Sequence, residues 1–155
     1  MPKISVGTRV PDFALPMTGG GTWSLKEASG KKLVIFFYPR DLTSGCTREA
    51  QDFRDLHAAF RKAGVLVVGV SRDPVASHDK FAAKESLPFP LLADVDEKLC
   101  KQFDVIKQKS MYGRKYLGVE RSTFLLDGSG RLRQEWRKVK VPGHAEEVLE
   151  AAQGL

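Results

Sequence analysis

Residues 33–49 read LVIFFYPRDLTSGCTRE, and this stretch decides the fold. Its first five residues form a continuous apolar run, which is typical of a buried strand. The residues that follow the stretch repeat apolar side chains at helical spacing, which predicts an amphipathic helix over residues 44–62. Ser44 or Thr43 is a suitable N-cap for that helix. A strand, a short loop and a helix in this order place Cys46 in the first helical turn.

Cys46 is a candidate nucleophile because of this position. The N–H groups of a first helical turn have no intrahelical partner, and the helix dipole favours negative charge there. A thiol in that place is biased toward the thiolate, which is the reactive form. Pro39 fixes the backbone after the strand, Thr43 supplies a hydroxyl, and Gly45 permits close approach beside the thiol. A free cysteine is commonly a small buried apolar residue, but these neighbours together favour a reactive thiol.

Length and composition bound the class of protein. The chain has 155 residues, 42% of them hydrophobic and 28% charged, which suits one soluble globular domain over residues 1–155. No apolar run is long enough for a membrane span, and residues 1–6 lack a signal-peptide core, so a cytoplasmic location is expected. The net charge of +6 is spread along the chain without a zinc-finger spacing or an aromatic platform, which argues against a nucleic-acid partner.

The rest of the chain predicts an α/β protein. The apolar run of residues 65–70 gives a second buried strand after the helix, which Gly64 ends, so strand, helix and strand form a parallel βαβ unit. Pro74 suits the first position of the next helix, with Asp73 as its cap. Further expected elements are a hairpin with strands at 13–15 and 22–25, a helical turn at 26–29, a helix at 75–86, a strand at 89–92, a helix at 95–103 capped by Asp94, a loop at 107–115, strands at 122–126 and 132–136 with a turn between them, and a helix from 143 to 152.

Several blocks of the sequence resemble one family in order along nearly the whole chain. The spacing Pro39-x-x-x-Thr43-x-x-Cys46 is similar to the active-site signature of peroxiredoxins, the thiol peroxidases of the thioredoxin superfamily. The wider pattern resembles the bacterioferritin comigratory protein (PrxQ) branch. The matching blocks are residues 38–49, 69–73, 77–81, 89–94, 109–113 (KSMYG) and 120–126. The resemblance implies a thioredoxin-like fold, a central mixed β-sheet flanked by helices.

The resemblance also implies roles for particular residues. Cys46 would be the peroxidatic nucleophile, which peroxide converts to a sulfenic acid, and Gly45 and Cys46 would offer N–H groups to the substrate. Thr43 would contact the peroxide, and Pro39 would shield the thiolate. Arg121, which by position alone is a surface residue at a strand end, would lie beside the thiol.

Glu49 is expected to pair with Arg121. The implied substrates are hydrogen peroxide and organic hydroperoxides, in antioxidant defence. This thiol chemistry requires no metal or other cofactor, and His57, His78 and His144 are isolated in sequence. Each histidine is therefore expected at the surface or at a helix cap.

The sequence departs from the family where a resolving cysteine is usual. Gln51 and Ala82 occupy the two positions at which the family's second thiol is found. Either the enzyme works with one cysteine, or Ala82 is an engineered replacement. The other thiol, Cys100, shares an apolar helix face with Leu99, which favours a core residue over an alternative resolving cysteine. An external thiol such as thioredoxin or glutaredoxin would then reduce the sulfenic acid.

Other functions remain as alternatives. A thiol–disulfide oxidoreductase needs a second cysteine three residues after the first, and Glu49 occupies that position. A non-catalytic redox sensor or holdase would use the fold for binding, and loss of peroxide consumption on Cys46→Ser discriminates against it. The expected assembly is a monomer.

Overall fold

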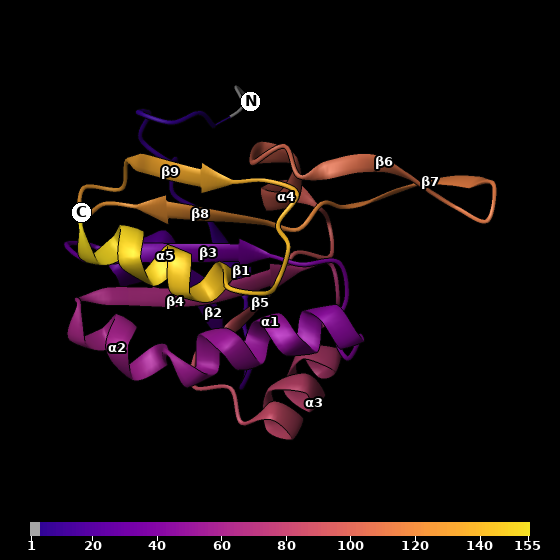
Figure 1. The fold of residues 1–155 in the computed structure, drawn as a ribbon, viewed down its shortest axis with the longest axis horizontal. Coiled ribbons are helices and arrows are strands. Elements are labelled where there is room, and N and C mark those ends of the chain that lie inside the picture. Colours follow the sequence, from indigo (N-terminus) through magenta and orange to yellow (C-terminus); the bar gives the residue numbers. More distant parts are fainter. Residues whose placement is uncertain (1–3) are drawn as a thin grey trace.

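A five-stranded mixed sheet forms the centre of the computed structural model, which describes residues 4–155 (Figure 1). Across the sheet the strands are β5 (Leu91–Ala93), β4 (Val65–Ser71), β3 (Lys32–Phe37), β8 (Ser122–Leu126) and β9 (Leu132–Trp136). The first three are parallel, and β8 and β9 are antiparallel to their neighbours. The predicted βαβ unit and mixed sheet are thereby confirmed. Residues 1–3 of the predicted lead-in lie outside the described residues.

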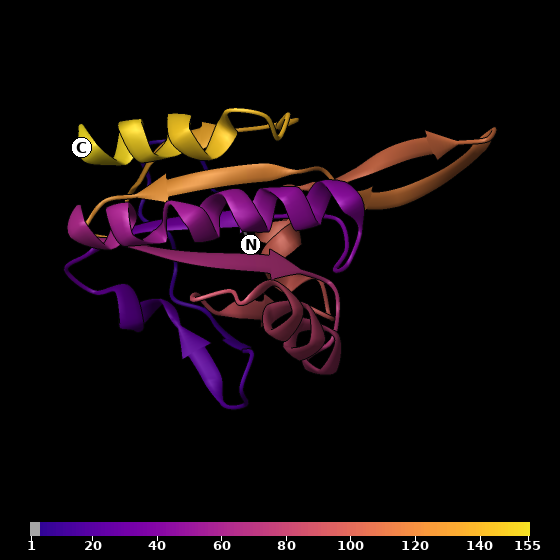
Figure 2. The ribbon, with the colours of Figure 1, turned by 60° about the horizontal axis from the view of Figure 1, so that its bottom comes forward.

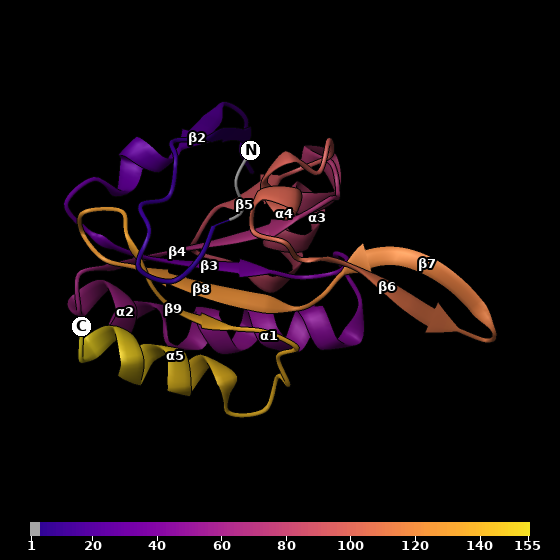
Figure 3. The same ribbon diagram turned by 90° about the horizontal axis from the view of Figure 1, so that it is seen from above.

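Helices and short elements cover both faces of the sheet (Figures 2 and 3). One face carries α1 (Ser44–Asp55), α2 (His57–Lys62) and α5 (His144–Gln153), and α3 (Val75–Glu85) packs beside β5. The other face carries β1 (Ala14–Pro16), β2 (Thr22–Ser24), the 3-10 turn η1 (Leu25–Ala28) and α4 (Lys98–Gln102).

Strand β3 divides the core into two clusters because successive side chains point to opposite faces. Val34 and Phe36 are buried under α1 and α2, together with Cys46. Ile35 and Phe37 are buried on the other face. Both faces are therefore apolar, as the continuous hydrophobic run predicted.

The first long helix was predicted over residues 44–62, and the structure divides it. Leu56 separates α1 from α2, with φ −99° and ψ 2° where a helix would continue. Phe53 and Phe60 stay buried in the same cluster on either side of the break. Gly64 follows α2 with φ +76°, as predicted for a residue after a helix C-terminus.

The second crossover helix, α3, begins at Val75 as predicted, but its capping differs. Pro74 lies at the N-cap rather than at the first helical position. Asp73 does not cap the helix, because its carboxylate accepts hydrogen bonds from the Ser71 hydroxyl and the Asp41 N–H. The neighbouring strand covers Leu91–Ala93 rather than residues 89–92.

The helix predicted over residues 95–103 is shorter than expected. Asp94 does accept bonds from the N–H groups of Leu99 and Cys100. However, Glu97 adopts a left-handed conformation with φ +63°, so α4 begins only at Lys98. Val95 therefore lies before the helix, and it is exposed.

The prediction of a loop over residues 107–115 is wrong. The chain there forms a hairpin of β6 (Ile106–Met111) and β7 (Arg114–Val119), which projects from the body of the molecule (Figure 1). Tyr112 and Gly113 make the turn, with φ +53° and +77°. Positive φ at both central residues fits the twist of a two-residue hairpin, but tyrosine is not a usual residue there.

The remaining strands and α5 lie close to their predicted bounds. Across residues 4–155, no helix combines the length and the apolar character needed to cross a membrane.

Candidate active site

Cys46 lies in the first turn of α1, at the end of the loop that follows β3. It is buried, with 2% of its surface exposed. The Nη2 group of Arg121 donates a hydrogen bond to its sulfur at 3.4 Å. The guanidinium and the N-terminal end of α1 therefore both place positive charge beside the sulfur.

Arg121 is held between two acidic partners. Its Nη1 group donates to Oε1 of Glu49 at 2.7 Å while its other nitrogen reaches Cys46. Burial opposes the charge on this side chain, but Glu49 and Cys46 together raise the pKa of Arg121 above its ordinary value. The predicted contact of Arg121 with both residues is therefore present in the structure.

Glu49 is fully enclosed. Its Oε2 atom has no hydrogen-bond partner among the described residues. Burial raises the pKa of Glu49 to about 7, although the Arg121 guanidinium opposes the shift. The carboxyl group thus gains a proton near neutral pH, which changes the charge beside Arg121.

Gly45 makes room for the arginine. A Cβ atom added to Gly45 would lie 3.2 Å from Nη2 of Arg121. That distance is tighter than ordinary van der Waals contact, so a larger residue would push the guanidinium away from the sulfur.

Thr43 and Pro39 lie on the loop that leads into α1. Thr43 occupies the N-cap position, but its hydroxyl donates to the carbonyl of Arg40 at 2.8 Å instead of capping the helix. Within residues 4–155, no hydrogen bond joins Thr43 to Cys46. The structure therefore brings Cys46, Glu49 and Arg121 into direct contact and leaves Thr43 beside them at the surface.

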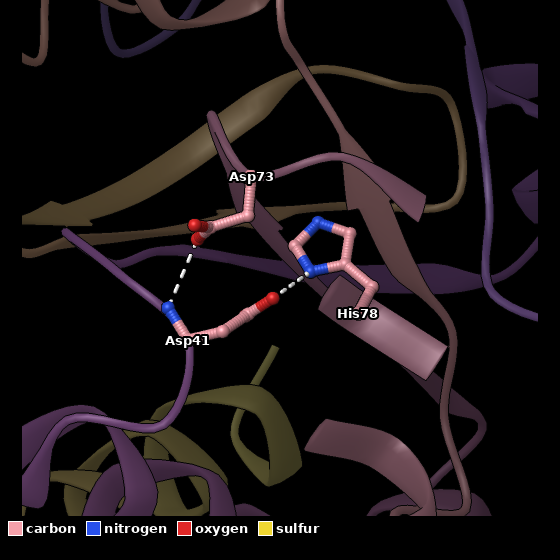
Figure 4. Close-up of side chains that lie close together, drawn as sticks. All are labelled: Asp41, Asp73 and His78. Atoms are coloured by element: carbon pink, nitrogen blue, oxygen red, sulfur yellow. Dashed lines mark hydrogen bonds and ion pairs between the residues drawn. The ribbon is translucent and has the colours of Figure 1, made fainter. Parts of the chain in front are cut away.

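A buried polar network that includes Asp41, Asp73 and His78 holds the same loop in place (Figure 4). Asp41 accepts hydrogen bonds from the hydroxyls of Tyr38 and Ser77, and its Oδ2 lies 2.7 Å from Nδ1 of His78. The N–H of Asp41 donates to Asp73 at 2.9 Å. These bonds connect the loop after β3 to the loop after β4 and to the first turns of α3.

The His78–Asp41 contact holds a proton. Nε2 of His78 lies 2.9 Å from the carbonyl oxygen of Leu92, which only accepts, so Nε2 carries a hydrogen. Nδ1 faces a carboxylate oxygen, so that short contact also requires a proton between the two atoms. Burial and the Asp41 carboxylate raise the pKa of Tyr38 well above its ordinary value, which keeps its phenol a donor.

Asp41, Asp73 and His78 could in principle ligate a metal, since their ligand atoms lie within 4.8 Å of one another. Each of the three already has hydrogen-bond partners from neighbouring side chains or backbone. The network is complete without an ion, and it serves as a structural connection.

The expectation that each histidine lies at the surface or at a helix cap is wrong for His78, and His144, although it is the first residue of α5, is not exposed. His78 is completely buried, and His144 is buried against Thr123 with its Nε2 at 2.8 Å from the threonine hydroxyl oxygen. Burial lowers the pKa of His144 to about 4. The spacing of His78 and Phe81 on one helix face could have indicated that His78 points inward.

Cys100 is a core residue, as its helix face predicted. It is completely buried in the cluster on the opposite side of the sheet from Cys46. Burial and then the charge of Asp94 raise the pKa of the Cys100 thiol, which disfavours the thiolate.

The two usual positions of a second thiol lie on the Cys46 side. Gln51 donates to Glu85 at 2.7 Å. Ala82 is half-buried and packs against the cluster that contains Cys46.

Comparisons with known proteins show which family the chain resembles. The family model described as AhpC/TSA family matches residues 6–135. Peroxiredoxin Bcp of Xanthomonas campestris pv. campestris is 55% identical over 140 residues, which cover 90% of this chain and 88% of that protein. Peroxiredoxin Bcp of Bacillus subtilis is 47% identical over 98% of this chain and 97% of its own.

Solved structures give the same result. A cysteine-to-serine mutant of Xylella fastidiosa PrxQ aligns with a TM-score of 0.94 and 42% identity, over 99% of this chain and 98% of its own. A structure of the Xanthomonas campestris bacterioferritin comigratory protein, which concerns the alkyl peroxide reduction activity of that protein, aligns with a TM-score of 0.87 and 53% identity over 92% and 90% of the two chains.

Proposed function

The chain belongs to the AhpC/TSA family and is a thiol-dependent peroxidase with a thioredoxin-like fold, and we propose that Cys46 is its peroxidatic nucleophile. The observation that carries the proposal is the hydrogen bond from Arg121 to the Cys46 sulfur at the start of α1. Arginine and helix terminus together stabilise the thiolate and the oxygen that leaves in the reaction.

The reaction that we propose is an in-line displacement at the peroxide. The Cys46 thiolate attacks the terminal oxygen, an S–O bond forms, and the O–O bond breaks. Its electron pair leaves with the second oxygen, which takes up a proton to give water or an alcohol. Thr43 and the N–H groups of Gly45 and Cys46 bind the peroxide, and Pro39 excludes water from the sulfur.

The sulfenic acid at Cys46 is resolved by an external thiol. Cys100 lies on the other face of the sheet, and Gln51 and Ala82 carry no sulfur, so attack from within the folded chain has no donor among residues 4–155. An incoming thiol forms a disulfide with Cys46 and releases water, and a second thiol returns Cys46 to its reduced form. Thioredoxin and glutaredoxin are the reductants that we propose.

Hydrogen peroxide and organic hydroperoxides are the proposed substrates, in antioxidant defence. We propose that the enzyme is a monomer. We also propose that it works in the cytoplasm, where thiol reductants regenerate Cys46.

Peroxide consumption with dithiothreitol as donor tests the proposal. Cys46→Ser abolishes turnover, whereas Cys100→Ser retains it because that thiol takes no part. Turnover by Cys46→Ser, or its loss in a folded Cys100→Ser variant, contradicts the assignment.

A further inference from the structure

The hairpin of β6 and β7 carries exposed apolar side chains and a single sign of charge. Met111, Tyr112 and Tyr116 expose 56%, 97% and 43% of their surfaces. Residues 106–119 contain four cationic side chains, Lys107, Lys109, Arg114 and Lys115, and no carboxylate. An apolar projection of this kind is unusual for a surface that contacts only water.

The register of the hairpin sorts these residues onto two faces. Lys109 is paired with Tyr116 and Met111 with Arg114, and paired residues share a face. A Cβ atom on Gly118 would lie 3.1 Å from Cδ of Lys109 and 3.2 Å from Cε2 of Tyr116, so both side chains extend over that glycine.

With the alternation of the strands, the register defines two sets of residues. The basic-aromatic face consists of Lys107, Lys109, Met111, Arg114 and Tyr116; the opposite face includes Gln108, Ser110, Lys115 and Leu117.

The basic-aromatic face adjoins the active site. The ammonium group of Lys109 donates to the Val119 carbonyl at 2.6 Å, two residues before Arg121. Burial lowers the pKa of Lys109, and the charge of Arg121 acts in the same direction, while Cys46 acts against it. Arg121, which follows β7 by two residues, contacts Cys46 in the first turn of α1, and Figures 2 and 3 show the base of the hairpin near this end of the helix.

The charge and composition of the hairpin indicate the kind of partner that it binds. The chain carries a net charge of +6, so a second copy would meet the hairpin with like charge. Tyrosine, methionine and arginine are the residue types enriched at the centre of protein interfaces.

We propose that the basic-aromatic face of this hairpin docks an acidic thiol-reductant protein and directs its thiol to Cys46. The proposal rests on the proposed function in one respect, that Cys46 forms a sulfenic acid which an external thiol must reduce.

Two matched double variants on β7 test the proposal. Arg114→Glu with Tyr116→Ser alters the basic-aromatic face, and Lys115→Glu with Leu117→Ser makes the same kind of change on the opposite face. For each protein, kcat/KM is measured with a thioredoxin of acidic isoelectric point and with dithiothreitol. The rate of Cys46 oxidation by hydrogen peroxide is measured separately by stopped flow.

The first variant is expected to lower kcat/KM for thioredoxin by about tenfold or more. Its rates with dithiothreitol and peroxide stay within about twofold of the parent, and the opposite-face variant stays within about twofold in every assay. Added salt is expected to reduce the difference in kcat/KM for thioredoxin between the parent protein and the first variant, because salt screens the charge of Arg114.

Four results would overturn the docking assignment. Equal losses from both variants would show that the face is irrelevant, and parallel losses with dithiothreitol would show a distorted site. A sedimentation coefficient that falls only in the first variant, or hairpin-dependent binding to anionic vesicles with unchanged thioredoxin kinetics, would assign the face to a second copy or a membrane. If peroxide does not oxidise Cys46 in the parent protein, the proposed function itself fails, which the docking variants do not decide.

Discussion

Arg121 is the residue on which the proposed chemistry depends most, because one guanidinium contacts both the nucleophile and a buried carboxyl group. The planar fork of arginine allows the two contacts to be made at once, which a lysine cannot reproduce. Glu49 orients the side chain, and Gly45 leaves the space through which Nη2 reaches the sulfur.

Gly45→Ala is expected to slow the reaction without destabilising the fold. Gly45 lies within α1, where alanine is the better helix former. The added Cβ displaces Nη2 of Arg121, so the second-order rate of Cys46 with hydrogen peroxide should fall by about tenfold. Stopped-flow oxidation measures the reaction rate and thermal unfolding measures the stability of the fold, with Ser44→Ala as the control. An unchanged rate in Gly45→Ala would show that the close approach is not needed.

Glu49→Gln is expected to remove one pH-dependent contribution to the stability of the fold. The folded-state pKa of Glu49 is raised from 4.5 to about 7, so the folded protein binds this proton more tightly than the unfolded chain. The resulting stabilisation is present at pH values below about 4.5 and is lost as the pH rises through about 7. Its size is on the order of 3 kcal/mol.

Glutamine keeps an acceptor for Arg121 but does not titrate. Urea unfolding at a series of pH values should therefore show that the free energy of unfolding of the parent, relative to that of the variant, falls as the pH rises from about 4.5 to about 7. His144, whose folded-state pKa is lowered from 6.5 to about 4, contributes an opposite slope over nearly the same pH range in both proteins, and the difference between the two proteins removes it. Parallel pH profiles for the two proteins would refute the role given to Glu49.

Single residues also show how far the sequence alone can be interpreted. Cys46 was identified from local features, because a strand, a loop and a helix start are adjacent in sequence. The contact of Arg121 with Cys46 spans 75 residues and could be expected only from the family resemblance. His78 was misplaced because its partners, Asp41 and Leu92, come from other elements.

At the scale of elements, the loop after β3 is fixed by a network that joins it to α3. Asp41→Asn is expected to destabilise the protein by about 3 kcal/mol, because asparagine offers one acceptor where the carboxylate accepts from three groups. The loop carries Thr43 toward Cys46, so peroxide oxidation should also slow.

Asp79→Asn is the matched control, since Asp79 lies on α3 next to His78, at the surface, and accepts one backbone hydrogen bond. Chemical unfolding and stopped-flow oxidation of both variants provide the comparison. If Asp41→Asn behaves like the control, the network does not hold the loop.

Elements were predicted well where burial imposes a strong pattern and poorly elsewhere. Strands β3 and β4 contain continuous apolar runs, β8 is buried along its whole length and ends in three apolar residues, and the bounds of all three were nearly correct. The β6–β7 hairpin is mostly exposed and polar, so its alternation carries no apolar signal, and its turn uses a tyrosine in place of asparagine or glycine.

At the scale of the whole molecule, the central sheet separates the two cysteines. Cys46 belongs to the cluster under α1 and Cys100 to the cluster under α4, so a disulfide between them requires extensive unfolding. Ala82 packs against the Cys46 cluster from α3, which needs only local rearrangement to approach.

Ala82→Cys is therefore expected to create an internal resolving thiol. After one equivalent of peroxide, this variant should lose two hydrogens and yield a peptide in which residues 46 and 82 are linked. Ala83→Cys, one residue along the exposed surface of α3, is the control and should not form the link efficiently. Equal cross-linking by both would show that position on the helix does not matter.

The most direct test of the central claim is the intact mass of the unsubstituted protein after one equivalent of hydrogen peroxide without added thiol, with dimedone trapping in parallel. The account predicts a gain of one oxygen at Cys46 that dimedone traps, because no second thiol lies on its side of the sheet among residues 4–155. A loss of two hydrogens, with Cys46 and Cys100 linked in the digest, would contradict it.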